Sequence, residues 1–388
     1  MMQRVIACAL LLLVCGSVAA EPIKKSAKTT AVHPSKPIKK SAKTTAVHPS
    51  APPKGVKTAP KGPPANHLFG GVAAPAPLAV RAIGSYAKGC LAGAVSLPIN
   101  GPAWQVMRLS RDRNWGHPRL LDFLERFAAD ARTLDGWPGL LVGDMSQPRG
   151  GPMITGHTSH QIGLDVDLWL TPMPDRTLSV QEREDMIAVS MLKDPFTVDR
   201  DKWTPLHTKL IKRAVSYPEV ARVFVHPAIK KVLCEQAGND RAWLAKVRPW
   251  WNHYYHFHVR ISCPPEAGDC ENQNPVSSDD GCGQELTHWY AMLTRAAIAG
   301  AGQPPPKPAG PRKSSLTMAN LPPECGTVLT AGGFEPVPLD ADTMPGPVFK
   351  ALASKEAGPP PPKLDAAALE ALIAREAGMS LPARNPKR

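Results

Sequence analysis

Two short stretches of this chain alternate apolar and polar residues, the pattern of strands that bury one face against a core. The first is GLDVDLWL at 163–170, in which Asp165 and Asp167 share one face and the alternating leucines and valine share the other. The second is HFHVRIS at 256–262, which places two histidines on one face. A fold that contains both strands must therefore keep one face of a sheet apolar and leave the other acidic and rich in imidazole.

The segments around these strands predict helices without the regular spacing of a βαβ fold. Helical spacing or helix-start signals occur in residues 118–134, 179–193, 204–214 and 227–234, and 222–225 is typical of a short strand. Proline at the first helical position, or a capping box at Ser179 and Glu182, marks where these helices begin. We therefore expect an α+β fold, in which helices flank a small, mostly antiparallel sheet that carries the polar residues.

A basic segment lies near the N-terminus. The chain has 388 residues, 44 prolines and a formal charge of +13, and residues 22–61 hold ten lysines and no acidic residue. PIKKSAKTTAVHPS occurs at 22–35 and again at 37–50, and it is too polar for a solenoid core. We expect a solvated linker, which is either a spacer attracted to anionic polymers or an unselected product of duplication. Because the excess charge lies in this linker and not on a folded face, nucleic acid is not an expected partner.

The first twenty residues predict export. A basic start, an apolar run at 6–14 and small residues before a cleavage point after Ala20 form a secretory signal. Cys15 raises the alternative of a lipoprotein, although Val14 fits a lipid-attachment box poorly. No later segment is long and apolar enough for a membrane helix, so we expect a soluble mature protein without stable membrane insertion.

The cysteines agree with export. The six that follow the signal form an even set, which in an exported chain indicates disulfides with fifteen possible pairings. A zinc-binding cysteine set is the alternative, but no CxxC pair occurs. The six are Cys90, Cys234, Cys263, Cys270, Cys282 and Cys325.

These features divide the chain into four parts. Residues 1–20 are the signal peptide, 21–78 a disordered Lys/Pro-rich linker with a 15-residue repeat, 79–300 the folded domain, and 301–388 a Pro/Ala-rich C-terminal extension. Cys325 is expected to tie the extension back to the domain, and residues 364–378 predict one amphipathic helix.

The polar faces of the two strands are the candidate site. If the strands pair, His160, Asp167 and His258 can converge, and two imidazoles with one carboxylate leave a fourth coordination position open, as in catalytic zinc sites. Such an ion polarises a carbonyl and lowers the pKa of its water. His256 would stand beside the ion as a base or as a stabiliser of an oxyanion, and Asp165 suits a supporting role.

Other polar and aromatic residues have less specific roles. Trp250 and Trp251 suit either a substrate groove or the core. The remaining histidines are expected to be solvated or hydrogen-bonded: His33, His48, His67, His117, His207, His226 and His288.

These motifs resemble the penicillin-insensitive murein endopeptidase family, in the wider group of lysostaphin, D-Ala-D-Ala metallopeptidase and sonic hedgehog folds. The resemblance begins with HTSHQIGLD and the HxxxxxxD pattern that runs from His160 to Asp167, and it continues with an HxH pattern at 256–258. It runs from about Cys90 to Cys325 through PAIKKVLC, KVRPWW, HFHVRISCP and DGCGQEL. The long N-terminal linker, the proline-rich insertion before Cys325 and the C-terminal extension depart from the family, and none of them touches the motifs.

The resemblance implies roles for particular residues. It implies a zinc ion held by His160, Asp167 and His258, with His157 as a further histidine that family members use for metal, and it assigns no complete second ligand set. It gives His256 the catalytic role, with His253 beside it. It also implies three disulfides, which pair Cys90 with Cys325, Cys234 with Cys282, and Cys263 with Cys270.

The function that the resemblance implies is a periplasmic zinc endopeptidase that hydrolyses the D-alanyl-meso-diaminopimelyl cross-bridge of peptidoglycan and is insensitive to penicillin. A D,D-carboxypeptidase or an amidase would use the same site.

A non-catalytic cell-wall binding protein is a different class, which the complete ligand set disfavours. A non-haem iron oxygenase also uses two histidines and a carboxylate, but export to an oxidising compartment disfavours ferrous iron. A serine hydrolase is disfavoured because no GxSxG motif occurs. The sequence does not indicate an oligomeric state.

Overall fold

The computed structural model describes residues 62–300, 316–335, 359 and 362–376. The expected signal peptide, the repeat and most of the C-terminal extension lie outside these described residues. Among the helices of the described part, none has both the length and the apolar composition needed to cross a bilayer.

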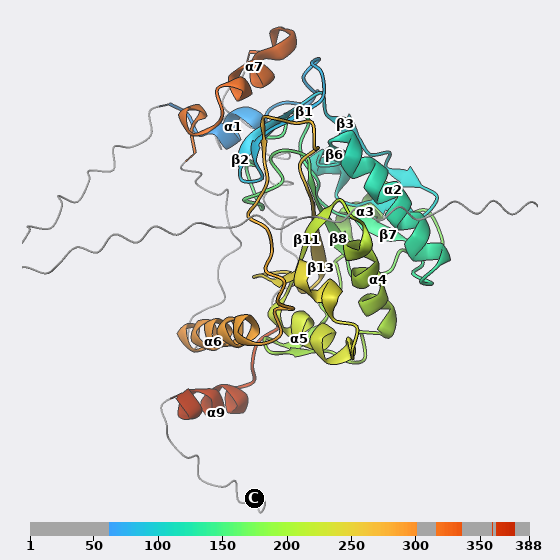
Figure 1. The fold of residues 1–388 in the computed structure, drawn as a ribbon, viewed down its shortest axis with the longest axis vertical. Helices are drawn as coiled ribbons and strands as arrows, with labels where there is room; N and C mark the ends of the chain where they lie inside the picture. Colours follow the sequence, from blue (N-terminus) through green and yellow to red (C-terminus); the bar gives the residue numbers. More distant parts are fainter. Residues whose placement is uncertain (1–61, 301–315, 336–358, 360–361, 377–388) are drawn as a thin grey trace, which may run out of the picture. The chain divides into compact units, whose positions relative to one another are not determined.

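A central sheet organises the domain. Its strand order is β12-β11-β13-β8-β7-β5-β4, and β11, β13 and β8 lie side by side in Figure 1. All the pairs are antiparallel except β11–β12 and β5–β7, so the expectation of a mostly antiparallel α+β fold is confirmed. The strands are β4 (Asn100–Gly101), β5 (Trp104–Val106), β7 (Leu140–Val142), β8 (Asp165–Trp169), β11 (Val220–Val225), β12 (Val247–Pro249) and β13 (His256–Ile261).

Smaller sheets form around this one. A three-stranded sheet has the order β14-β1-β2, and two further pairs join β3 to β6 and β9 to β10. These strands are β1 (Arg81–Ser85), β2 (Lys88–Ala92), β3 (Val95–Ser96), β6 (Trp115–Gly116), β9 (Leu192–Asp194), β10 (Thr197–Val198) and β14 (Cys270–Glu271).

The four helices expected between residues 118 and 234 begin where the sequence signals predict. Three of them carry proline at the first turn, where a missing N–H costs no hydrogen bond. These are α2 (Pro118–Thr133), α4 (Pro205–Ser216) and α5 (Pro227–Gln236); the other helices are α1 (Ala65–Phe69), α3 (Val180–Asp185), α6 (Gln284–Ala299), α7 (Glu324–Thr330) and α9 (Ala366–Glu376). Short 3₁₀ turns are η1 (Leu109–Arg111), η2 (Ala242–Lys246), η3 (Met318–Asn320) and η4 (Ala331–Gly333).

The helix expected over 179–193 is shorter than predicted. Ser179 and Glu182 form the capping box, but the helix ends at Asp185 and residues 192–194 form β9 instead. The carbonyl of Met186, the first residue past the helix, accepts a hydrogen bond from Arg108 Nη2 at 2.8 Å. A tertiary contact with a distant arginine thus satisfies this carbonyl, which a longer helix would have used itself.

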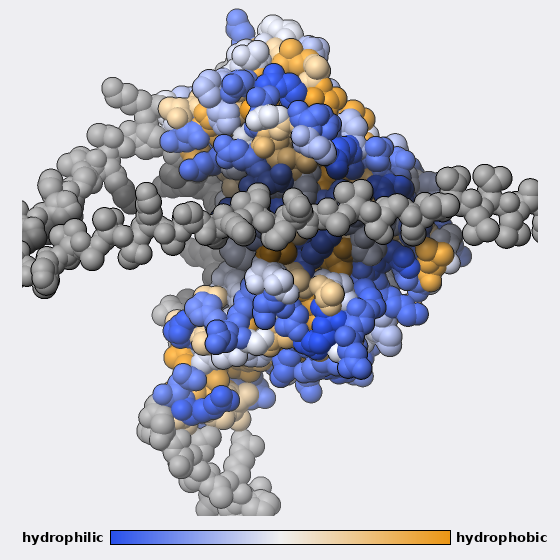
Figure 2. Space-filling view, viewed as in Figure 1, coloured by the Kyte–Doolittle hydropathy of each residue, from blue (hydrophilic) through white to orange (hydrophobic). Residues whose placement is uncertain are grey.

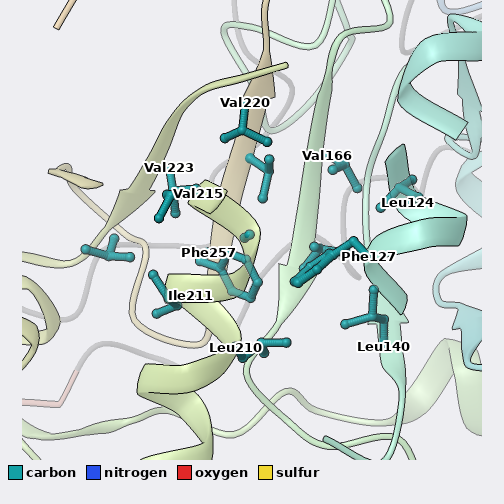
Figure 3. Packing of buried hydrophobic residues seen from close by; sticks show 14 of the residues in the cluster. Leu124, Phe127, Leu140, Val166, Leu210, Ile211, Val215, Val220, Val223 and Phe257 are labelled. Carbon is teal, nitrogen blue, oxygen red and sulfur yellow. The ribbon is translucent and has the colours of Figure 1, made fainter. Parts of the chain in front are cut away.

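The core forms on the apolar face of the central sheet. Val166 of β8, Phe257 of β13 and Val223 of β11 are fully buried, and Leu210 of α4 and Phe127 of α2 pack in the same cluster (Figure 3). In the view of Figure 2, most of the described surface is hydrophilic, with scattered hydrophobic patches. The opposite face of the sheet is therefore left for polar side chains, as the alternation of the two strands predicts.

A second cluster extends the packed region beyond the expected boundary at residue 79. Phe69 of α1 is fully buried with Val328 and Leu329 of α7 and with the Cys90–Cys325 disulfide. Residues 65–76 therefore belong to the folded part and not to the linker, because their apolar side chains pack in one buried cluster with residues of β1 and β2. The three implied disulfides are confirmed, and the other two pair Cys234 with Cys282 and Cys263 with Cys270.

Candidate active site

The register of two antiparallel strands builds the polar face. His258 lies directly opposite Asp167 across β13 and β8, and Arg260 lies opposite Asp165. His256 lies opposite Trp169. Directly opposed residues share a face of the sheet, so the predicted convergence of these imidazoles and carboxylates is what the pairing produces.

The loop that enters β8 adds a third ligand-type side chain. His160 has a φ of 70°, in the left-handed region that is uncommon for a residue with a side chain. Its backbone N–H donates to Asp165 Oδ2 at 3.0 Å. Gly163 has a φ of 69°, and a Cβ there would lie 2.9 Å from the backbone nitrogen of His117. These two left-handed residues turn the loop sharply, and the ring of His160 is fully buried.

Asp167 stands at the centre of the cluster. Its Oδ1 lies 3.1 Å from His258 Nδ1 and 3.5 Å from His160 Nε2. Its Oδ2 lies 3.4 Å from His157 Nε2 and 3.5 Å from His256 Nε2. Burial alone would raise the pKa of Asp167, but the surrounding imidazoles hold it well below the usual value. The carboxylate is therefore an anion among four histidines.

Asp165 connects the cluster to Arg260. Arg260 donates to both of its oxygens, Nε to Oδ1 at 2.7 Å and Nη2 to Oδ2 at 3.1 Å. His258 Nε2 lies 3.0 Å from the same Oδ1, so Asp165 fixes the imidazole while Nδ1 faces Asp167. Burial lowers the pKa of His258, yet the field of Asp165 and Asp167 outweighs it and raises that pKa to about 9. The two carboxylates thus favour a positive charge here, which a proton or a metal ion can supply.

Sequence reasoning missed Asp144, which follows β7. Its Oδ2 lies 3.0 Å from His157 Nε2, and Arg113 donates to the same oxygen at 2.8 Å. Arg111 Nη1 donates to both oxygens at 3.1 Å. The available signal was an acidic residue directly after an apolar strand, LLVGD, which alone does not distinguish a site from a loop. Asp144 fixes the position of His157 beside the cluster.

His253 and His256 are two further histidines of this cluster. Their ring centroids are 4.9 Å apart, and His253 Nδ1 lies 2.5 Å from the carbonyl oxygen of Trp251. Burial lowers the pKa of His256 to about 4 and holds that of His253 well below its usual value. Both imidazoles are therefore neutral near pH 7 and able to accept a proton.

A cleft opens over this polar face. It has a volume of about 790 Å³. His157, Asp167, His253, His256 and His258 line it, and Asp144 lines the same wall. His160 is too deeply buried to be a lining residue. The rest of the lining includes Arg108, Arg111, Trp169, Trp250, Trp251, Asn252 and Tyr255.

The donor set fits a metal ion. The described residues contain two overlapping groups whose ligand atoms lie within 4.8 Å of one another: His157 with His160 and Asp167, and Asp167 with His253 and His258. Both ring nitrogens of His160, with Asp167 Oδ1, are buried without a hydrogen-bond partner. A tetrahedral ion with bonds of about 2.0 Å needs ligand atoms about 3.3 Å apart, close to the 3.1 and 3.5 Å separations around Asp167 Oδ1.

Three other histidines of the described part of the chain have ordinary structural roles. His117 and His226 accept the backbone N–H groups that begin α2 and α5. His207 Nε2 lies 3.0 Å from the carbonyl oxygen of Leu170, and its Nδ1 accepts from the backbone of Thr204. His33 and His48 lie outside the described residues.

A cleft lined with histidines and buried carboxylates, on the polar face of an α+β domain, is the arrangement expected of a metallopeptidase. The sequence profile described as "Penicillin-insensitive murein endopeptidase" matches residues 82–330, and the chain belongs to that family.

Relatives with that same name support the assignment. The protein from Haemophilus influenzae is 47% identical over 210 residues, which cover 54% of this chain and 72% of the relative. The protein from Klebsiella pneumoniae is 40% identical over 249 residues, covering 64% of this chain and 86% of the relative. The protein from Escherichia coli is 40% identical over 255 residues, covering 66% and 88%.

Proposed function

We propose that this chain is a zinc-dependent murein endopeptidase that hydrolyses the D-alanyl-meso-diaminopimelyl cross-bridge of peptidoglycan. The observation that carries the proposal is the cluster of buried donor atoms around Asp167 at the wall of the cleft. The names of the relatives supply the substrate class, murein. The signal expected at residues 1–20 supplies the location, which we take to be the periplasm.

We assign zinc to His160, Asp167 and His258, with His157 as a further ligand. These are borderline nitrogen donors and one carboxylate, a set typical of catalytic zinc sites. Asp165 and Asp144 would orient His258 and His157 in the way that carboxylates orient metal-bound imidazoles. A bound Zn²⁺ supplies a Lewis acid that polarises a carbonyl and lowers the pKa of water.

The chain's own residues carry the proton chemistry in this proposal. His256 Nε2 lies 3.5 Å from Asp167 Oδ2, beside the proposed ligands and facing the cleft. Its Nδ1 is buried without a hydrogen-bond partner. An imidazole in this position can take a proton from water and return it to the leaving amine, or donate to an oxyanion. His253, next to it, would keep the ring of His256 in place.

The reaction itself is the direct test. Purified protein is expected to convert cross-linked muropeptide dimers into monomers. A chelator is expected to stop this conversion, whereas penicillin is expected to have no effect on it. Ser159 lines the cleft, but among the described residues it makes no hydrogen bond to a histidine that would activate it, and the described cysteines are all in disulfides. We therefore expect a β-lactam to find no activated nucleophile to acylate. Mass spectrometry of the digested muropeptides measures the result.

Each other product would point to a different enzyme or to none. Release of free D-alanine would make the protein a D,D-carboxypeptidase, and separation of peptide from sugar would make it an amidase. Inhibition by penicillin at ordinary doses would contradict the metal mechanism. If the zinc-loaded protein forms no product, the protein is a non-catalytic wall-binding protein.

We also propose that the domain of residues 79–300, with the packed segments that flank it, is the catalytic unit. Deleting residues 22–61 is expected to leave the rate on soluble muropeptides nearly unchanged and to weaken association with isolated cell walls. The ten lysines of that segment would bind anionic wall polymers, so added salt should weaken the association of the parent protein as well. Sedimentation with cell walls at several salt concentrations measures this. A large loss of rate on soluble substrate would instead place the segment in the active site.

A further inference from the structure

Trp250 is an exposed indole at the edge of the cleft. Its side chain is 52% exposed, and in the described part of the chain it is the single aromatic residue among the exposed large hydrophobics. Trp250, Trp251 and Asn252 all line the cleft beside His253. An exposed indole costs free energy in water, so its position next to the proposed catalytic residues suggests a ligand.

Neighbouring aromatic rings pack against the indole of Trp250. Trp289 of α6 is buried and meets Trp250 and Trp251 edge-to-face, with ring centroids 5.6 and 5.4 Å apart. Phe224 of β11 meets Trp250 in the same manner at 6.0 Å. The backbone N–H of Trp250 donates to Val225 at 2.8 Å. A ring packed by its neighbours in this way offers its free surface at little cost in conformational entropy.

The chemistry of this surface is neutral and amphipathic. Asn252 is exposed on the same turn and has a φ of 64°, a left-handed conformation that asparagine tolerates. The nearby guanidinium of Arg248 is paired with Glu285 at 3.2 Å. Tryptophan rings with an adjacent amide, and without a free charge, suit a pyranose: its C–H face packs on indole and its acetamido group bonds with an amide.

We propose that Trp250, Trp251 and Asn252 form a binding surface for a neutral N-acetylated amino sugar of the glycan strand that carries the cleaved peptide. The inference rests on the proposed murein substrate, because that polymer joins each peptide to a sugar. A peptide that lies in the cleft over His256 then brings its attached glycan past the rim. The surface would add binding energy remote from the reacting bond.

The first experiment measures sugar binding without any hydrolysis. Calorimetric titration with tri-N-acetylchitotriose is expected to detect binding to the wild-type protein, a similar affinity for Trp250→Phe, and a loss for Trp250→Ala. Leu134→Ala is the matched control, since Leu134 is 63% exposed and lies outside the cleft. No binding by the wild type, or equal binding by Trp250→Ala, overturns the proposal.

The second experiment compares two cross-linked dimers, one with its disaccharides and one stripped of sugar. The wild type is expected to prefer the sugar-bearing dimer, and Trp250→Ala to reduce that preference by about three- to tenfold, mainly through KM. An equal loss of cleavage efficiency on both dimers would mean that the indole binds the peptide, and it would overturn the proposed sugar-binding surface. If neither dimer is cleaved while chitotriose binding still depends on Trp250, the surface stands and the proposed endopeptidase function fails.

Discussion

Replacing His160 or Asp167 with alanine is expected to abolish stoichiometric zinc and activity together, whereas His256→Ala is expected to keep the zinc and lose activity. Asp167 is within 3.5 Å of both His160 and His258, so either ligand substitution opens the centre of the donor set. His256 contacts the other oxygen of Asp167 and acts on protons, so its loss should lower kcat by about 10²–10⁴-fold.

Metal analysis of the purified variants, alongside their rates on muropeptide dimers, measures both effects. His207→Ala is a suitable control, because His207 is buried on α4 and bonds to a backbone carbonyl outside the cluster. That variant should retain zinc even where its stability falls. A His256 variant as active as the parent would show that the assigned role is wrong, and a zinc-loaded His160 variant would do the same for the ligand set.

Removing the Cys90–Cys325 disulfide is expected to cause the largest loss of stability of the three bridges. The cross-link joins residues 235 positions apart, and closing so long a loop stabilises the folded state by about 5–6 kcal/mol in the chain-entropy model. It also anchors α7 over β2, because both cysteines are fully buried there. The double variant Cys90→Ala/Cys325→Ala should therefore unfold at a clearly lower denaturant concentration.

The Cys263–Cys270 bridge provides the internal control. It closes a loop of only seven positions, for which the same relation gives about 2–3 kcal/mol. Denaturant unfolding of the two double variants compares them under one set of conditions. Equal losses would mean that loop entropy is not what the long bridge contributes, and free thiols at Cys234 and Cys282 in the parent would contradict the pairing itself.

The amino-acid sequence by itself determined which faces of the two site strands are polar. Alternation is a local property of extended backbone, so Asp165 and Asp167 had to share a face wherever the strand lay. The starts of α2, α4 and α5 were equally predictable, since proline at the first turn acts within a few residues. The disulfide pairs came from the family resemblance, because six cysteines by themselves allow fifteen pairings.

Only the tertiary structure decided what depends on contacts between distant parts of the chain. The register that sets His258 opposite Asp167 joins residues ninety-one positions apart, and the left-handed turn at His160 is stabilised by a bond to Asp165. The same holds for Asp144, which reaches the site only because β7 lies beside β8, and for the early end of α3. The sequence allowed Trp250 to lie either in the core or in a groove. The tertiary structure leaves its indole exposed, with one edge packed against Trp289. Local patterns determine the direction of side chains, whereas burial and partners are determined by which distant residues pack against them.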